Sequence, residues 1–205
     1  MSLTFYTNPM SRGQIARWML EETGLPYEEV LLDYGTTMKA PEYLAINPMG
    51  KVPALRHGDT VVTESAAICL YLADLVPEKR LAPPPGSPER GPYYRWILFL
   101  AGPLEAVLTA RHAGALAPPT SAGYGAEGDV VRVLEQAVSG KTHLAGDRFT
   151  AADLFMTAYL SFYMQFGMLE RRPAFEAFCA HHLNRPAGLA AKARDEALIA
   201  AQKAT

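Results

Sequence analysis

The sequence predicts an α/β unit followed by an all-helical unit. Short β-type and helical segments alternate in the first 76 residues, an order that suits a sheet covered by helices. Residues 77–92 then hold six prolines and two glycines, a composition that prevents regular structure and marks a connection. Residues 93–205 show helical periodicity and no convincing strand. We therefore expect domains at 1–76 and 93–205, joined by the proline-rich linker 77–92.

The first unit is expected to run β-α-β, then an irregular helix, then β-β and a final helix. Residues 3–7 favour a strand through Phe5, Tyr6 and two threonines. The segment "RGQIARWMLEETG" has apolar residues at helical spacing, with Gly24 placed to end the helix. The later elements are a strand in "PYEEVLLD", a short helix in "APEYLAIN", a hairpin in "PALRHGDTVVT" and a buried helix in "ESAAICLYLADLV".

The second unit is expected to contain only helices. Its periodic segments are "YYRWILFLAGPLEAVLTARHAG", "EGDVVRVLEQAVS", "AADLFMTAYLSFYMQF" and "RPAFEAFCAHHL". Pro103 lies inside the first of these and should kink that helix or split it. Thr150 and Asp153 have the spacing of a capping box at a helix start, which is a folding signal and not a catalytic one.

The charge balance favours a small ligand over a large charged partner. The 205 residues carry 19 Lys+Arg against 21 Asp+Glu, a formal net charge of -2, so no overall field attracts nucleic acid or an anionic membrane. The start of the chain has neither a charged leader nor a long apolar run, and no stretch reaches about 18 uninterrupted apolar residues. We therefore expect a soluble cytoplasmic protein with no nucleic-acid or membrane partner.

The cysteines and histidines do not indicate a metal site. Cys69 and Cys179 lie in different regions and form no C-x-x-C pair, so both are expected to be buried apolar residues. His112 and the pair His181–His182 lack metal-ligand companions at useful spacing. No metal is assigned on this basis.

Pro53 stands where the stretch "INPMGKVPAL" is about to become a strand. Proline cannot donate a ladder hydrogen bond, although Val52, Ala54 and Leu55 beside it suit a strand. A kink that exposes the backbone of Val52 to a ligand is one interpretation, and an ordinary proline at the edge or first position of a strand is the other.

Four motifs together resemble the soluble glutathione transferase superfamily. They are "FYTNPMSRGQIARWMLEE", "NPMGKVPAL", "TESAAICLYLAD" and "GDRFTAADLF", and they lie in this order on either side of the linker. The resemblance implies a thioredoxin-like first domain that binds glutathione as co-substrate, and a helical second domain that contributes the electrophile pocket. It also implies a homodimer, with an active-site loop of the serine- or cysteine-using type as in bacterial-like members.

The resemblance assigns glutathione-binding roles around the proline and at the third helix. A cis bond between Val52 and Pro53 would turn the Val52 N–H and C=O outward to pair with the peptide backbone of glutathione. Ser65, with the backbone N–H groups that begin the helix, would bind the γ-glutamyl carboxylate, and Glu64 the ammonium group. The simpler alternative is that Glu64 and Ser65 only begin a helix.

The glycyl carboxylate of glutathione would need a cation of its own. Lys51 and Lys39 are the candidates by charge and by their position near the proline loop. The alternative is that both lysines are solvated surface residues.

Thiol activation is assigned to the loop "TNPMSRG". Ser11 lies five residues beyond Tyr6, the spacing at which serine- and cysteine-using members place the active hydroxyl or thiol. Tyr6, at the end of the first strand, is the alternative used by tyrosine-type members, although the loop here is too long for that pattern. Arg12 could add charge or orient the loop, and Asn8 is a secondary donor. A helix N-cap and nothing more is the alternative for Ser11.

Serine at position 11 also limits the chemistry. It cannot form a mixed disulfide, so thiol transfer is disfavoured and addition of the glutathione sulfur to an electrophilic carbon fits best. A glutathione-dependent peroxidase or isomerase acting on one metabolite is the alternative enzyme. A non-catalytic interaction module that keeps the fold is the alternative from another class.

Overall fold

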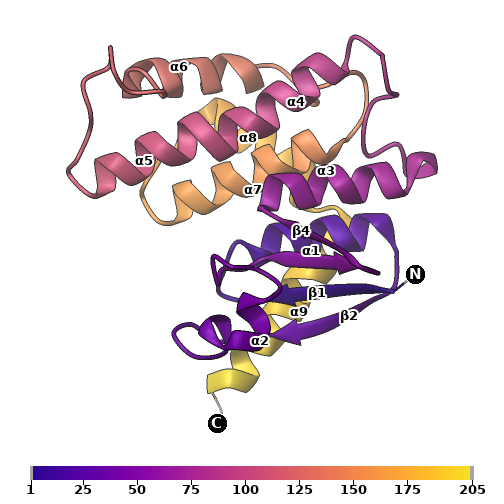
Figure 1. Ribbon diagram of the computed structural model, residues 1–205. Helices are drawn as coiled ribbons and strands as arrows, with labels where there is room; N and C mark the ends of the chain where they lie inside the picture. The colour runs from indigo at the N-terminus through magenta and orange to yellow at the C-terminus, as the bar shows by residue number, and fades with distance from the viewer. Residues whose placement is uncertain (1, 204–205) are drawn as a thin grey trace. The chain divides into compact units, whose positions relative to one another are not determined.

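The computed structural model describes residues 2–203, which form two compact units (Figure 1). Residues up to Lys79 and from Arg185 onward make the first unit, and Arg80–Asn184 make the second. The first unit contains a four-stranded sheet, whereas the regular elements described in the second are all helices.

Four strands form the sheet, in the spatial order second, first, third, fourth. They are β1 (Leu3–Thr7), β2 (Tyr27–Leu31), β3 (Ala54–His57) and β4 (Thr60–Thr63). β1 and β2 are parallel, and the crossover that a parallel pair requires is supplied by α1 (Gly13–Thr23). β3 runs antiparallel to both β1 and β4, and β3 and β4 form the expected hairpin.

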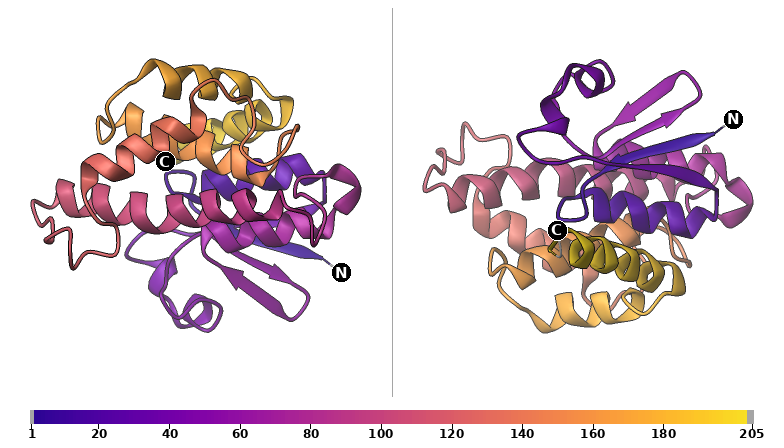
Figure 2. Two further views of the ribbon diagram at one scale, coloured as in Figure 1. Left: turned by 90° about the horizontal axis from the view of Figure 1, so that it is seen from above. Right: turned by 90° about the horizontal axis from the view of Figure 1, so that it is seen from below.

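Helices and short turns complete the first unit. They are a 3₁₀ turn (Thr37–Lys39), α2 (Pro41–Leu44), α3 (Ser65–Leu75), a second 3₁₀ turn (Pro77–Lys79) and α9 (Pro186–Lys203). α1 packs against both α3 and α9. In the right-hand view of Figure 2, the yellow α9 runs beside the indigo α1 although the two are far apart in sequence.

β1 is the central element of the first unit because both of its faces are buried. All five of its residues are buried, and successive side chains point to opposite faces. The guanidinium of Arg17, from α1, lies over the Phe5 ring, with its Cζ 5.4 Å from the ring centroid. Tyr6 points the other way, into an apolar cluster with Leu32, Met38, Tyr43 and Ala54.

Arg17 attaches α9 to the sheet unit through a fully buried guanidinium. Its Nε donates to Asp195 Oδ1 of α9 at 2.8 Å, and its Nη2 donates to Glu29 Oε1 of β2 at 2.8 Å. A second bond to Glu29, from Nη1 to Oε2 at 3.2 Å, makes that pair bidentate. Burial alone would lower the pKa of Arg17, but the hydrogen bond and charges of Glu29 and Asp195 raise it. The buried charge is therefore compensated by two carboxylates.

The second unit is built around one buried helix. Its helices are α4 (Arg90–Phe99), α5 (Glu105–His112), α6 (Glu127–Val138), α7 (Ala151–Gln165) and α8 (Pro173–His182). α7 is buried along most of its length and packs against α4 and α8. The capping box at its start is present as expected, with the Thr150 N–H donating to Asp153 Oδ2 at 2.8 Å.

Pro103 splits the first helical segment of the second unit. A π-helical turn, Leu100–Leu104, stands between α4 and α5 and contains this proline. A widened turn accommodates a residue that has no N–H and whose ring would collide with the preceding turn. The expectation of a kink or split is confirmed.

The division of the chain differs in two places from the expected boundaries. α9 groups with the first unit, whereas residues 93–205 were expected to form one helical domain. The physical reason is the buried Arg17–Asp195 pair, which ties α9 to α1. α4 begins at Arg90, inside the stretch 77–92 that was expected to be a linker.

None of the helices described between residues 2 and 203 has both the length and the apolar character that a membrane span requires.

We predict that Asp195→Ala lowers the free energy of unfolding by about 3 kcal/mol, because it removes one partner of a buried ion pair. The measurement is urea denaturation of the purified protein. Arg194→Ala is the matched control on the same helix, because the Arg194 side chain is 55% exposed where it pairs with Glu29. That control should lose less than about 1 kcal/mol. Equal losses in the two variants would contradict the role given to Asp195.

Candidate active site

The loop between α2 and β3 is fixed by hydrogen bonds to one carbonyl group, that of Lys51. Tyr43 Oη donates to the Lys51 carbonyl oxygen at 2.5 Å, and Asn47 Nδ2 donates to the same oxygen at 2.7 Å. Asn47 also accepts the Met49 N–H at 3.1 Å through its Oδ1. Burial raises the pKa of Tyr43 to about 12, so this hydroxyl keeps its proton and remains a donor at neutral pH. The main-chain direction at residue 51 is thus set by two side chains.

Gly50 is required by the turn of this loop. Its φ is +55°, and its N–H donates to the Asn47 carbonyl oxygen at 2.7 Å. A Cβ at this position would lie 2.6 Å from the Met38 carbonyl oxygen, which is closer than such atoms approach. Glycine satisfies both the positive φ and the close approach.

Val52 follows this fixed carbonyl and precedes the strand β3. Its peptide bond to Pro53 is cis, as expected, and Pro53 itself is buried. Val52 is half-buried, and within residues 2–203 no hydrogen bond joins its N–H or C=O to another protein group. A main-chain donor and acceptor in this position can pair with an extended peptide, as an added strand does.

The start of α3 provides a second set of groups near the end of β4. Glu64, the residue before the helix, has φ +69° and makes no side-chain capping hydrogen bond. A non-glycine residue in the left-handed region is strained by about 1–3 kcal/mol, and such residues cluster at functional sites. Ser65 is the first residue of the helix, where N–H groups without helical partners favour an anion.

The Ser11 hydroxyl is part of the turn that begins α1. It accepts the Gly13 N–H at 2.9 Å and donates to the Asn8 carbonyl oxygen at 2.6 Å. The N-cap of α1 is Arg12, which makes no side-chain capping hydrogen bond, so Ser11 lies one residue before the cap and its bond to Gly13 belongs to the preceding turn. To donate to a ligand, the hydroxyl must rotate its proton away from Asn8.

The side chains of Asn8 and Tyr6 make contacts within the protein that support the fold. The Asn8 side chain is buried, donates to the Leu32 carbonyl oxygen at 2.8 Å and accepts the Met10 N–H at 2.9 Å. It ties the loop after β1 to the end of β2. Tyr6 lies in the apolar cluster, with its ring 5.6 Å from that of Tyr43, and it lines an apolar hollow beside α2.

The cationic candidates lie at the surface of the first unit. Lys39 makes a hydrogen bond within the protein, from its Nζ to the Met49 carbonyl oxygen at 2.9 Å. Lys51 and Arg12 are exposed. Lys39 therefore helps to hold the loop that carries Val52, whereas Lys51 projects from that same loop.

Sequence reasoning missed the residues that hold the loop. Tyr43 and Asn47 read as ordinary members of the short helix "APEYLAIN", and only the turn residues of "NPMG" indicated that the chain reverses there. Their convergence on one carbonyl group depends on how α2 folds back toward β3. No one-dimensional pattern contains that information.

The sheet unit therefore presents an unpaired backbone segment before one strand and a strained helix entrance after the next. These two features are typical of a site for a small, extended, peptide-like molecule with an anionic end.

The comparisons with known proteins identify the family. The model for the glutathione S-transferase N-terminal domain matches residues 1–74, and the model for its C-terminal domain matches residues 120–186. Glutathione S-transferase 3 of Zea mays is 32% identical over 174 residues, which is 74% of this chain and 73% of the maize protein. The chain belongs to the glutathione S-transferase family, with a thioredoxin-like N-terminal domain and a helical C-terminal domain.

Solved structures of bacterial proteins agree with this assignment. A glutathione transferase from Methylococcus capsulatus is 29% identical with a TM-score of 0.79, and the match covers 95% of this chain and 98% of that chain. A sphingomonad glutathione S-transferase complexed with glutathione is 26% identical with a TM-score of 0.76, covering 94% and 98% of the two chains.

Proposed function

We propose that this protein is a glutathione transferase, which binds glutathione, ionises its thiol and adds the sulfur to a hydrophobic electrophile. The observation that carries the proposal is the backbone of Val52, which precedes a cis proline and is unpaired with any described group. The family membership and the sphingomonad relative that holds glutathione support the same ligand.

Glutathione binding would use the two features of the sheet unit together. The cysteinyl part of the tripeptide pairs with the N–H and C=O of Val52, as one strand pairs with another. The γ-glutamyl carboxylate receives hydrogen bonds from Ser65 and the first N–H groups of α3, where the positive end of the helix dipole favours an anion. Glu64 pairs with the ammonium group, and exposed Lys51 is the cation for the glycyl carboxylate.

In this proposal, Ser11 stabilises the ionised thiol of glutathione. The Ser11 hydroxyl exchanges the Asn8 carbonyl oxygen, its partner at 2.6 Å, for the sulfur anion. A hydrogen bond to a charged group contributes about 1.5–3 kcal/mol against about 1 for a neutral one, so the exchange yields about 0.5–2 kcal/mol. That net gain lowers the thiol pKa by about 0.4–1.5 units. Arg12 and the start of α1 add positive charge next to the loop.

Conjugation is favoured over disulfide chemistry by the residue types present. Ser11 cannot form a mixed disulfide, and the two cysteines, Cys69 and Cys179, are buried and free. Burial raises the pKa of the Cys179 thiol to about 11, which keeps it protonated and unreactive. The sulfur of glutathione is thus the nucleophile.

The proposal includes a homodimer in the cytoplasm, supported by the family and by two free thiols that suit a reducing compartment. Two exposed aromatic side chains, Phe162 on α7 and Phe166 directly after it, are candidate contacts for the electrophile.

We predict that glutathione binds with a measurable heat in titration calorimetry, and that Glu64→Gln weakens binding about 10- to 100-fold. The reason is the loss of a charge-assisted hydrogen bond to the ammonium group. Glu28→Gln, an exposed substitution on β2, is the control and should bind like the parent protein. Absence of heat, together with no rise in melting temperature at millimolar glutathione, would contradict the proposal and favour the non-catalytic module.

We predict that Ser11→Ala lowers kcat/KM for a generic aromatic halide by about 2- to 30-fold and raises the pKa of the bound thiol, as read from the thiolate absorbance. Ser139→Ala is the matched control, because it also removes a hydroxyl that donates to a main-chain carbonyl, that of Glu135 at 2.7 Å. Tyr6→Phe should leave the thiol pKa unchanged. A raised thiol pKa in Tyr6→Phe and not in Ser11→Ala would transfer the role to Tyr6.

A further inference from the structure

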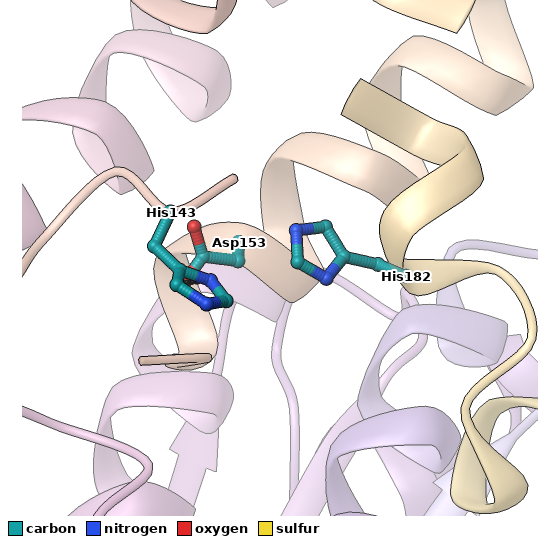
Figure 3. A group of neighbouring side chains, drawn as sticks. All are labelled: His143, Asp153 and His182. Carbon is teal, nitrogen blue, oxygen red and sulfur yellow. Dashed lines mark ion pairs between the residues drawn. The ribbon is translucent and has the colours of Figure 1, made fainter. Parts of the chain in front are cut away.

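Three residues that the proposed function does not use come together inside the second unit. They are His143 from the segment before α7, Asp153 in the first turn of α7 and His182 at the end of α8. One potential ligand atom from each lies within 4.8 Å of the other two. Figure 3 shows the side chains of His143, Asp153 and His182 gathered together.

The His143 ring carries a buried nitrogen that the fold leaves without a hydrogen bond. Its Nδ1 is buried and has no partner among the described residues. The nearest carboxylate oxygen, Asp153 Oδ2, is 4.0 Å away, which is too long for a hydrogen bond. An unpaired buried nitrogen beside a carboxylate calls for a bridging cation or a water, since native proteins leave few such atoms unpaired.

The Asp153 carboxylate is held in one orientation by its neighbours. Its Oδ1 accepts the Leu144 N–H at 2.7 Å, and its Oδ2 accepts the Thr150 N–H at 2.8 Å and the Thr150 hydroxyl at 3.0 Å. A carboxylate has about four acceptor positions, so these three bonds leave one for a further partner. Hydrogen bonds of this kind orient the ligands around metal ions.

The His182 ring is also held in place, by a hydrogen bond to the segment before α7 and by aromatic packing. Its Nε2 donates to the Thr142 carbonyl oxygen at 2.8 Å, and its ring lies 5.2 Å from Phe149 and 5.0 Å from Phe178 between centroids. The Thr142 carbonyl is itself an oxygen donor next to the cluster. Aromatic packing on the ring limits its movement.

The cluster combines a buried carboxyl group with a path to solvent. The Asp153 side chain is fully buried. His143, with 22% of its side chain exposed, keeps the site in contact with solvent, so an ion has a way in.

We propose that His143, Asp153 and His182 form a binding site for a divalent transition-metal ion, with Zn²⁺ as the preferred ion. Two imidazoles and one carboxylate are a ligand set of zinc, whereas Mg²⁺ and Ca²⁺ prefer oxygen ligands alone. A tetrahedral ion with bonds of about 2.1 Å brings its ligands to roughly 3.4 Å apart, so separations of up to 4.8 Å must shorten by as much as about 1.4 Å. His143, which has no hydrogen bond to break at Nδ1, can supply most of that movement.

A metal here would join three segments of the second unit. It would link the loop before α7 and the end of α8 to the first turn of α7, through the Asp153 carboxylate that also belongs to the capping box. No metal is assigned from the sequence because His181–His182 have no companions nearby in the chain, whereas the fold brings His143 and Asp153, which are 39 and 29 residues before His182, close to it. The site lies within the second unit and does not depend on glutathione binding.

The test is uptake of Zn²⁺ by the full-length, untagged protein after chelator treatment. We expect calorimetry with Zn²⁺ alone to show one ion bound per chain, with a higher melting temperature, and Mg²⁺ to give neither. Binding should weaken as the pH falls, because the ligating histidines must be unprotonated. Failure to take up stoichiometric Zn²⁺ would overturn the proposal.

Two variants locate the ion. His143→Ala removes a partly exposed side chain with no hydrogen bond at Nδ1, so the fold should persist by circular dichroism while Zn²⁺ affinity falls at least tenfold. His181→Ala, which alters an exposed histidine adjacent to His182, is the matched control and should keep full affinity. Unchanged affinity in His143→Ala, or an equal loss in both variants, would show that any bound Zn²⁺ lies elsewhere and overturn the assignment.

Discussion

The carbonyl group of Lys51, held by two hydrogen bonds, is the constraint on which the candidate site depends. Tyr43 and Asn47 both donate to this oxygen, just before the chain enters β3. Because the Lys51 carbonyl and the Val52 N–H belong to one planar peptide group, holding the first also sets the direction of the second. A loop held in this way pays little conformational entropy when a ligand binds, which is the advantage of a preorganised site.

The rigidity of this loop comes in turn from the sheet unit. β1, buried on both faces, supports Tyr6 and the apolar cluster under α2 on one side. On the other side it supports Phe5 and the guanidinium of Arg17, which anchors α9. The same strand thus positions the loop that carries Ser11 and the packing beneath the loop that carries Val52. The loops of the site are therefore anchored to a packed sheet, which is the support that precise recognition requires.

Much of the fold could be predicted from the sequence because its signals are local. The β-type residues of β1, the glycine that ends α1 and the capping box of α7 each act within a few residues, and all three are confirmed. The cis bond before Pro53 was also expected, although from family resemblance and not from local pattern. Pro103 interrupts its helix because proline has no N–H and its ring collides with the preceding turn, so this interruption can be predicted from a single residue.

The remainder depends on contacts that the linear chain does not display. Arg17 reads as a surface residue of an amphipathic helix, yet it is fully buried because Glu29 and Asp195 reach it from β2 and α9. The five-residue spacing between Tyr6 and Ser11 points to Ser11 as the active hydroxyl. It does not predict the hydrogen bond from that hydroxyl to the Asn8 carbonyl oxygen. His143 becomes a neighbour of His182 only when the helices of the second unit pack. In each case a partner distant in sequence determines the role.

Amide hydrogen exchange at Val52 tests the central claim most directly. In the free protein this N–H should exchange rapidly, because no described group accepts it, whereas the Gly50 N–H, bonded to Asn47, should exchange slowly. Saturating glutathione should slow exchange at Val52 by an order of magnitude or more and leave Gly50 unchanged. Bound glutathione with undiminished exchange at Val52 would contradict the account, because the ligand would then be held without the backbone pair.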